Sequence, residues 1–497
     1  MRPLLYTFLS FGLAIGSGFF GGTASAADDP VTAAMKLYEK RRYEQAGRLL
    51  EEARFDGERE AQAQLALGMI YLRNAGLHEA FARTAAAAEL DYLDKLTKVG
   101  GEGRSRYARL YLAEALLARG NAREAARHFE RVRGDVGVDG HYRSIAGIGL
   151  GAAFWAQGET ARARKLWSEP QQDAIEIRLA RAAAQGHAGV LDPKTLQRVA
   201  DDARGTKDLS SRARRYLVEI YLAAAAPDQA LAVARAADLA TASYVERFKA
   251  AEGTAKTIAF YDLALLTDLA QLYRELARRR LEQAANDART KPTAEYYLAE
   301  ALGGLGETDA AAAMAQAFLA RPQAPAQYRE RARARLVLLG YRQGKQEDAE
   351  RAWTAMAGET SDPEVLAAIV LGCADAGAPC AKAVVRAGQA AEAGDVRRTQ
   401  RLGFALGAYY LRKQDYARAI AYMEGGRDKS NKNKIEANDP EMLAALAEAY
   451  YRTKKFSEGL EIFFEMSQEF AVVRQIQEAM QAVYSIEQRS AGDVRIL

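Results

Sequence analysis

One pairing of a large residue with a small one recurs along the chain and constrains its fold more than any other feature. Clear copies begin at Leu67, Leu150, Leu406 and Leu446, each followed by Gly or Ala and then by an aromatic residue three positions later. A second small residue follows twelve positions after the first. Small residues let two helices approach closely, and an aromatic side chain fills the space beside the contact. The pattern therefore predicts pairs of tightly packed helices.

Glycines between the two halves of each copy indicate where the first helix of a pair ends. A residue in the left-handed conformation is favoured there, and glycine adopts it without steric cost. One such pair cannot bury its apolar face alone, so several pairs must stack on one another. The glycines at these predicted turns are Gly76, Gly120, Gly158, Gly306 and Gly344.

The complete frame resembles the tetratricopeptide repeat (TPR) family. Nine units match between about Pro30 and Met466, and the equivalent Ala46 and Ala80 of the first two units are 34 residues apart, the family's period. Other spacings include 38, 40 and 45 residues, so loops or longer helices intervene. The unit-closing Pro is mostly absent, and Trp is missing from its usual first-helix position. The resemblance implies an all-α fold, a right-handed α-α superhelix of the TPR-like solenoid type.

The repeats divide the chain into five expected segments. Residues 1–26 form a signal peptide, 27–237 an N-terminal TPR-like array, 238–290 an irregular helical segment, 291–466 a C-terminal array, and 467–497 a capping helix and tail. The irregular segment reads as amphipathic helices over Tyr244 to Ala250 and Ile258 to Ala285, without the repeat signature. Another kind of α-solenoid stays open for that middle part. Apolar residues at helical spacing between Phe470 and Gln488 predict the cap.

The N-terminus has the layout of a secretory signal. Arg2 is followed by an apolar stretch from Leu4 to Ile15, and Ala24-Ser25-Ala26 supplies the small residues of a cleavage site. No Cys lies near that exit to carry a lipid. A retained membrane anchor is the alternative, but Gly, Ser and Thr in the second half of the stretch argue against it. We therefore expect a periplasmic or otherwise exported protein.

Cysteine usage fits such a compartment without providing the fold. The chain has two cysteines, Cys373 and Cys380, separated by a segment with Gly377 and Pro379 that predicts a turn. Helices that meet at this turn would bring the thiols together, and an exported protein can keep such a bridge. A disulfide is therefore expected, with two buried thiols as the alternative.

Several kinds of chemistry have no signature in the sequence. With 69 Lys and Arg against 65 Asp and Glu, the chain lacks the strong basic excess expected of a nucleic-acid-binding protein. The four histidines show no metal-ligand spacing, and neither a phosphate-binding loop nor a nucleophile elbow occurs. We predict no enzyme, no metal and no cofactor.

The resemblance also implies where a ligand would bind. In TPR proteins the first helices of the pairs line a concave surface that binds peptides or protein segments. Transferring that frame yields nine candidate positions, for each of which an ordinary packing or solvated role is the alternative. They are Arg73, Arg215, Glu219, Glu300, Phe404, Arg412, Glu448, Tyr451 and Arg452. The same frame also places Glu114, Trp155 and Leu411 on the lining.

These observations favour a periplasmic scaffold or adaptor that binds a protein of the cell envelope, in a membrane-associated complex of the pilus, secretion or polysaccharide-export type. This expectation rests on analogy at the level of the fold. A binding module for exported polysaccharide or peptidoglycan is the second hypothesis, and a helical-toroid enzyme with paired carboxylates is the third. The identity of the partner and the oligomeric state stay open.

Overall fold

The computed structural model describes residues 29–99, 101–170, 174–206, 209–236, 243–249, 255–261, 264–322, 324–378, 380–393, 396–428 and 438–467. The expected signal peptide and, apart from Ser467, the expected capping helix and tail lie outside this set. The described residues form two compact units. Unit 1 comprises Phe81–Leu272, and unit 2 combines residues 29–80 with residues 273–467.

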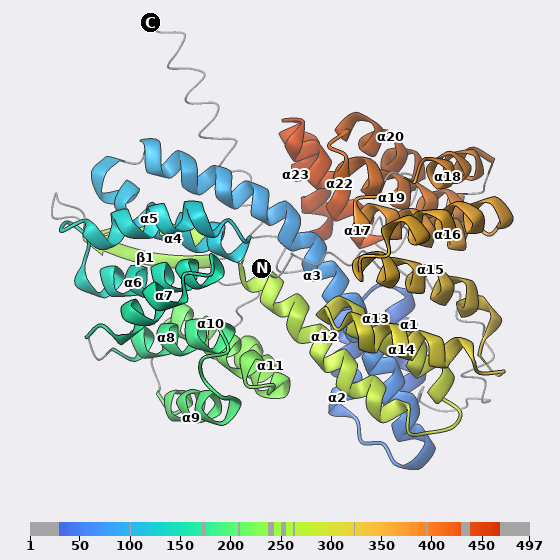
Figure 1. Cartoon of the computed structure of the whole chain (residues 1–497), viewed down its shortest axis with the longest axis horizontal. Coiled ribbons are helices and arrows are strands. Elements are labelled where there is room, and N and C mark those ends of the chain that lie inside the picture. Colours follow the sequence, from blue (N-terminus) through green and yellow to red (C-terminus); the bar gives the residue numbers. More distant parts are fainter. Residues whose placement is uncertain are drawn as a thin grey trace, which may run out of the picture. The chain divides into compact units, whose positions relative to one another are not determined.

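Unit 1 is a series of helix pairs followed by a hairpin (Figure 1). First helices α4, α6, α8 and α10 pack on one another along the series, and each also packs on the second helix of its own pair. In chain order the elements are the end of α3 (Gly57–Val99), α4 (Gly101–Ala118), α5 (Ala122–Gly134), α6 (Gly140–Ala156), α7 (Thr160–Ser168), α8 (Ile175–His187), α9 (Pro193–Arg204), α10 (Ser211–Ala223), α11 (Pro227–Ala236), β1 (Ser243–Lys249), β2 (Ala255–Tyr261) and the start of α12 (Ala264–Ala284).

Unit 2 is built in the same way from both parts of the chain. Its first helices are α13, α15, α17, α19 and α22, and they also pack on one another in order. Its elements are α1 (Pro30–Glu39), α2 (Tyr43–Glu52), the rest of α3 and α12, α13 (Lys291–Leu305), α14 (Thr308–Leu319), α15 (Ala326–Arg342), α16 (Gln346–Glu359), α17 (Pro363–Ala376), α18 (Ala381–Ala393), α19 (Val396–Arg412), α20 (Tyr416–Gly426), α22 (Pro440–Arg452) and α23 (Phe456–Ser467).

The predicted fold class, a solenoid of TPR-like helix pairs, is confirmed, and the small residues act as expected. A Cβ atom at Gly151 of α6 would lie 2.5 Å from Trp167 Nε1 of α7. The indole N–H of Trp167 donates to the carbonyl of Ile148 at 3.1 Å, so the ring lies across the glycine. Gly407 of α19 would meet Met423 of α20 in the same way.

Four of the five predicted turn glycines end a first helix in the left-handed conformation. The φ angles are 78° at Gly120, 83° at Gly158, 83° at Gly306 and 91° at Gly344. The prediction for Gly76 is wrong, because the 43-residue helix α3 runs through this position without a break. A Cβ atom at Gly76 would lie 2.8 Å from Glu441 Oε1 of α22, so this glycine serves a close approach between helices.

The middle segment departs from the all-helical prediction. The helix expected over Tyr244 to Ala250 is wrong: β1 pairs antiparallel with β2, and Ser243 lies opposite Tyr261. The helix expected from Ile258 begins only at Ala264. Both strands are rich in β-branched and aromatic residues, which favour extended backbone once a partner strand is present.

The two units also divide the chain differently from the predicted arrays. Residues 30–80 were expected in the N-terminal array but belong to unit 2, together with the C-terminal array. Unit 1 is therefore inserted in sequence between the two parts of unit 2.

Candidate functional site

The inner face of unit 2, formed by its first helices, is filled by the chain's own N-terminal helices. Arg73 of α3 donates from Nε to the hydroxyl of Tyr38 on α1 at 3.1 Å. Its Nη1 lies 3.7 Å from Glu441 Oε1 at the start of α22. Both partners of this ion pair are buried, with side chains 8% and 6% exposed. The candidate Arg73 is therefore a packing residue of unit 2.

The complete burial of two first helices also indicates that residues 30–80 cover the inner face of unit 2. Every residue of α22 from Pro440 to Tyr451 is buried, as is every residue of α13 from Thr293 to Gly304. A helix buried around its whole circumference needs neighbours on both sides. The second helices cover one side of the array, and residues 30–80 reach the other through Tyr38, Arg73 and Gly76.

Further residues of the inner face lie near Tyr38 and Arg73, as the mutual effects on their pKa values indicate. Burial raises the pKa of Tyr38, opposed by Arg73, and the Glu300 carboxylate of α13 raises it further. Burial also raises the pKa of Glu300, because the nearby guanidinium groups of Arg335 and Arg73 only partly offset the loss of water. Glu300 pairs with Arg335 of α15 at 3.2 Å, and both side chains are buried.

The other candidates of unit 2 differ in exposure. Phe404 and Tyr451 are buried, and the Tyr451 ring meets Phe456 edge-on at 5.4 Å. Glu448 is buried and pairs with the more exposed Arg452 at 3.6 Å. Arg412 is partly exposed and lies 3.9 Å from Asp375. Among these candidates only Arg412 and Arg452 keep surface that a partner could reach.

Unit 1 gathers charged residues from four first helices on its inner face. Arg212 of α10 is buried, and its Nη1 donates to Glu114 of α4 at 2.6 Å. Its Nε lies 3.5 Å from Glu176 of α8. Arg215, one turn later, pairs with Glu219 at 2.8 Å. We call this group the inner cluster; its members are Glu114, His141, Glu176, His187, Arg212, Arg215 and Glu219.

Both histidines of the inner cluster face a carboxylate. His141 Nε2 of α6 lies 3.4 Å from Glu176, and His187 Nε2 lies 3.3 Å from Glu219. Burial opposes ionisation of Glu176, but the hydrogen bond with His141 and the Arg212 charge outweigh it and lower its pKa. Burial is likewise outweighed at Glu219, whose pKa is lowered by Arg215 and His187.

The lining positions from the sequence included Glu114, Arg215 and Glu219 but missed the other four members of the inner cluster. One sequence pattern does indicate part of the inner cluster. Arg212, Arg215 and Glu219 follow the helical spacing of three and four residues and so share one face of α10. Nothing local indicates that Arg212 reaches Glu114, because that contact joins the first and the fourth helix pair of unit 1.

Cys373 and Cys380 form a disulfide bond with a Cα–Cα distance of 6.1 Å. Cys373 lies near the end of α17, which Gly377 closes with φ 68°, and Cys380 directly precedes α18. The bridge thus joins two consecutive helices across their turn.

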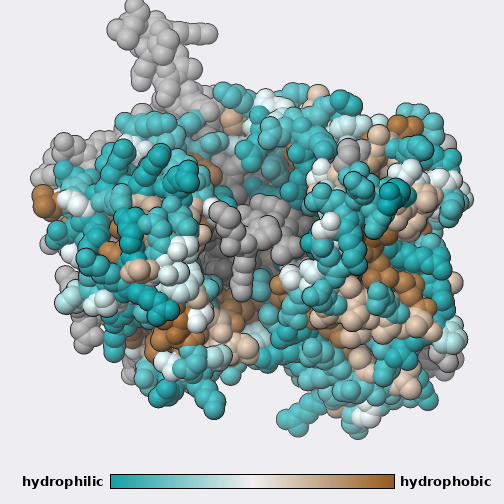
Figure 2. All heavy atoms as spheres, in the orientation of Figure 1, coloured by the Kyte–Doolittle hydropathy of each residue, from teal (hydrophilic) through white to brown (hydrophobic). Residues whose placement is uncertain are grey.

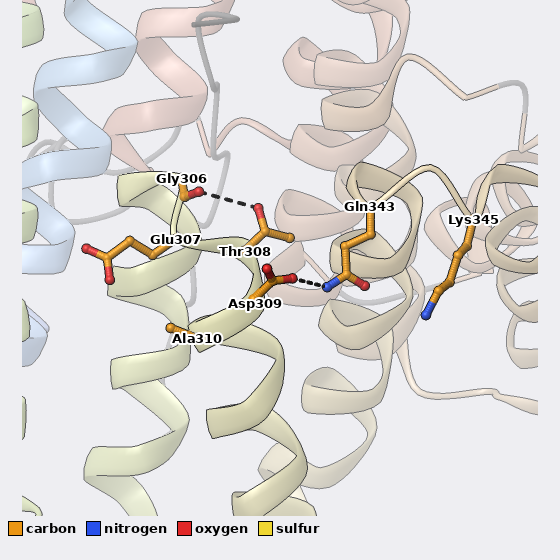
Figure 3. Close-up of a pocket in the computed structure, with 7 residues that line it drawn as sticks. All are labelled: Gly306, Glu307, Thr308, Asp309, Ala310, Gln343 and Lys345. Atoms are coloured by element: carbon orange, nitrogen blue, oxygen red, sulfur yellow. Dashed lines mark hydrogen bonds between the residues drawn. The ribbon is translucent and has the colours of Figure 1, made fainter.

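A shallow cavity of about 770 Å³ lies beside two helix turns of unit 2 (Figure 3). Asp309 of α14 accepts a hydrogen bond from Gln343, which follows α15, at 2.7 Å. The cavity is open to solvent, and it brings together no pair of carboxylates buried from water. Its lining residues are Gly306, Glu307, Thr308, Asp309, Ala310, Gln343 and Lys345.

The described part of the chain also lacks two features. Within it, no three His, Cys, Asp or Glu side chains are grouped so that they could hold a metal ion. None of its helices combines the length and the apolar character needed to cross a membrane.

No protein-family model matches the chain, and no curated protein matches it. Among solved structures, it is similar to yeast Tom70, with 11% identity, 93% of this chain and 95% of that chain covered, and a TM-score of 0.32. For a chain of the APC/C hetero-tetramer Cut9–Hcn1, the identity is 12%, 92% of this chain and 96% of that chain are covered, and the TM-score is 0.28. For the TPR domain of P58(IPK) they are 15%, 78%, 99% and 0.19. With such low TM-scores these likenesses add nothing to what the chain's own helix pairs show, which is a helical-repeat architecture of TPR-like pairs.

Proposed function

We propose that this protein is an exported scaffold that binds a protein partner of the cell envelope through the inner cluster of unit 1. One observation carries the choice of site. The inner face of unit 2 is filled by residues 30–80, whereas the inner cluster keeps exposed groups at its edge. His187 has a side chain 50% exposed and His141 one 26% exposed.

The chemistry of the inner cluster indicates the kind of segment that would bind. Its three carboxylates face two guanidinium groups, so the carboxylates outnumber the guanidinium groups by one. Aromatic surface adjoins it: the Tyr142 ring meets His141 at 5.3 Å and Tyr107 at 5.2 Å. Aromatic residues beside charged ones are typical anchors at protein interfaces. A segment with a Lys or Arg side chain fits this surface.

Two features support an exported location. The N-terminal sequence from Arg2 to Ala26 has the layout of a secretory signal. The disulfide between Cys373 and Cys380 is of the kind that persists in oxidising compartments. Assembly of a pilus, a secretion system or a polysaccharide exporter is the finer form of this proposal.

The test is crosslinking in cells, followed by purification of the chain and mass spectrometry. One variant carries His187→Ala and Tyr142→Ala at the edge of the inner cluster. Its matched control carries Arg412→Ala and Arg452→Ala, the reachable candidates of unit 2. Circular dichroism checks that both variants keep the helical content of the wild type.

We expect one discrete envelope protein to be lost from the first variant and kept by the control. Loss from the control alone would move the site to unit 2 and contradict the proposal. Recovery of polysaccharide or muropeptide without a protein would contradict it as well and would favour the second hypothesis.

A further inference from the structure

The second helices α5 and α7 of unit 1 carry an exposed row of basic side chains. On α5, Arg123, Arg127 and Arg131 recur every four residues and therefore form one stripe. All three are exposed, whereas Ala125, Ala126, Phe129 and Val132 on the opposite side are buried. Three basic residues of α7 are exposed, namely Arg162, Arg164 and Lys165. The helix contains no acidic residue. We call these six residues the basic row.

Both helices of the basic row pack on α6. Phe129 of α5 packs on Gly149, and Trp167 of α7 packs on Gly151. Arg133 at the end of α5 donates to both carboxylate oxygens of Glu169, just after α7, at 3.0 and 2.8 Å. Hydrophilic residues cover most of the surface over α5 and α7 in the view of Figure 2.

An apolar side chain projects from the turn that follows α5. Val136 is 89% exposed, more than any other large hydrophobic residue in the described part of the chain. Its neighbour Asp135 accepts a hydrogen bond from the backbone of Gly137 at 2.9 Å and pairs with Arg106 at 3.1 Å. The turn therefore holds Val136 outward, beyond the end of the arginine stripe.

We propose that the basic row docks unit 1 on an anionic lipid surface, with Val136 entering the headgroup layer. Basic residues at a membrane surface each strengthen binding by an electrostatic attraction to anionic lipids. Glu124 and Glu130 of α5 lie among the arginines, and Glu159 pairs with Arg162 at 2.6 Å; these carboxylates reduce the attraction without cancelling it. An exposed apolar side chain beside basic residues suits a surface whose outer layer is charged and whose interior is apolar.

The observations favour a lipid surface over a second copy of this chain. A second copy would need an acidic row of similar extent. Acidic groups do occur on the outer helices of unit 2, such as Glu458, Glu461 and Glu465 on α23, so the choice of a lipid surface rests on the exposed Val136 beside the basic row. The aromatic rings beside the basic row lie under its arginines: Phe154, beneath Arg162, is buried, and Trp155, near Arg164, is only partly exposed, whereas aromatic anchors of protein interfaces need an accessible ring.

The test measures co-sedimentation of the mature chain with vesicles at low ionic strength. Vesicles of phosphatidylcholine with about one third phosphatidylglycerol are compared with pure phosphatidylcholine. The variant carries Arg123→Gln, Arg127→Gln and Arg131→Gln, because Gln and Arg have similar helix propensity. The matched control removes three exposed charges from unit 2 through Lys345→Gln, Lys382→Gln and Lys454→Gln.

We expect binding to the anionic vesicles only, weakened about fivefold for each arginine removed and hence about 100-fold in the triple variant. The control should bind nearly as the wild type does, and Val136→Ser should weaken binding several-fold. Added salt should release the protein, because the Debye length falls to about 10 Å at 0.1 M.

Four outcomes would overturn the proposal. Three of them are equal binding to both kinds of vesicle, an equal loss in variant and control, and binding to heparin without binding to vesicles. The last would show that the basic row recognises an acidic polymer. Self-association of the wild type at low salt that the triple arginine variant loses, again without vesicle binding, would assign the row to a second copy instead.

Discussion

Arg73 on α3 and Glu441 on α22 form a buried ion pair, although one lies in the first repeats of the chain and the other in the last. Arg73 also donates to the buried hydroxyl of Tyr38. The pair thereby joins the N-terminal helices to the inner face of the C-terminal array. This contact explains why unit 2 combines the two parts of the chain.

Arg73→Met should destabilise unit 2 by about 3–5 kcal/mol, because it leaves the Glu441 carboxylate buried without this cation. The measurement is chemical unfolding followed by circular dichroism. Arg59→Ala is the matched control: Arg59 pairs with Asp29 at 3.0 Å on the surface, where such pairs contribute about 0–1 kcal/mol. The double variant Arg73→Met, Glu441→Leu should regain part of the loss. A loss no larger than that of the control would show that the pair does not hold the two parts together.

Two glycines should respond in opposite ways to replacement by alanine. A Cβ atom at Gly403 of α19 would lie 2.7 Å from the backbone oxygen of Tyr422, which cannot move aside as a flexible side chain can. Gly403→Ala should therefore cost about 1–3 kcal/mol. Gly340 of α15 has nothing within 4 Å of its Cβ position, so Gly340→Ala should stabilise the helix by about 0.5–1 kcal/mol. The measurement compares the melting temperatures of the two variants with that of the wild type. A shift of the same sign in both variants would contradict the packing seen here.

Acid should weaken unit 1 partly through Glu176. Despite burial, its pKa is lowered by His141 and Arg212, so its ionised form stabilises the fold. That contribution is complete above the ordinary value of about 4.3 and is lost as the pH falls through the lower value of the folded state. Glu176→Gln should therefore be less stable than the wild type at neutral pH, and the difference should shrink toward pH about 3.

Glu300 offers a control of opposite sign, because burial raises its pKa above the ordinary value. Its ionisation opposes folding, so the wild type should gain stability relative to Glu300→Gln as the pH falls through the raised value. Thermal unfolding of both variants over a pH series tests the pair. If the stability differences of Glu176→Gln and Glu300→Gln from the wild type changed with pH in the same direction, the opposite pKa shifts of these two residues would be contradicted.

Reduction of the Cys373–Cys380 bridge should cost about 2–3 kcal/mol, because the loop it closes is short. The melting temperature of the wild type should fall when reductant is added. The double variant Cys373→Ala, Cys380→Ala should melt near the reduced wild type and should not respond to reductant. A wild type indifferent to reductant would indicate that the bridge does not form in solution.

The helix pairs and most of their turns could be predicted from the sequence because they depend on neighbouring residues. The spacing from Gly151 to Trp167 specifies a contact within one pair, and Gly158 adopts its left-handed turn through its own conformational freedom. The same local frame located Arg215 and Glu219 on an inner face.

The tertiary structure decided what depends on residues far apart in the chain. Gly76 sits within a continuous helix, where its missing side chain leaves room for Glu441, and β1 is extended beside β2. Arg212 joins the inner cluster only because the stacking of four helix pairs brings it to Glu114. Sequence periodicity reports which face of a helix is apolar, but it carries no information on which distant segment covers that face. For this reason the sequence determined that the chain is an array of helix pairs, and only the tertiary contacts decided that residues 30–80 fill the inner face of the C-terminal array.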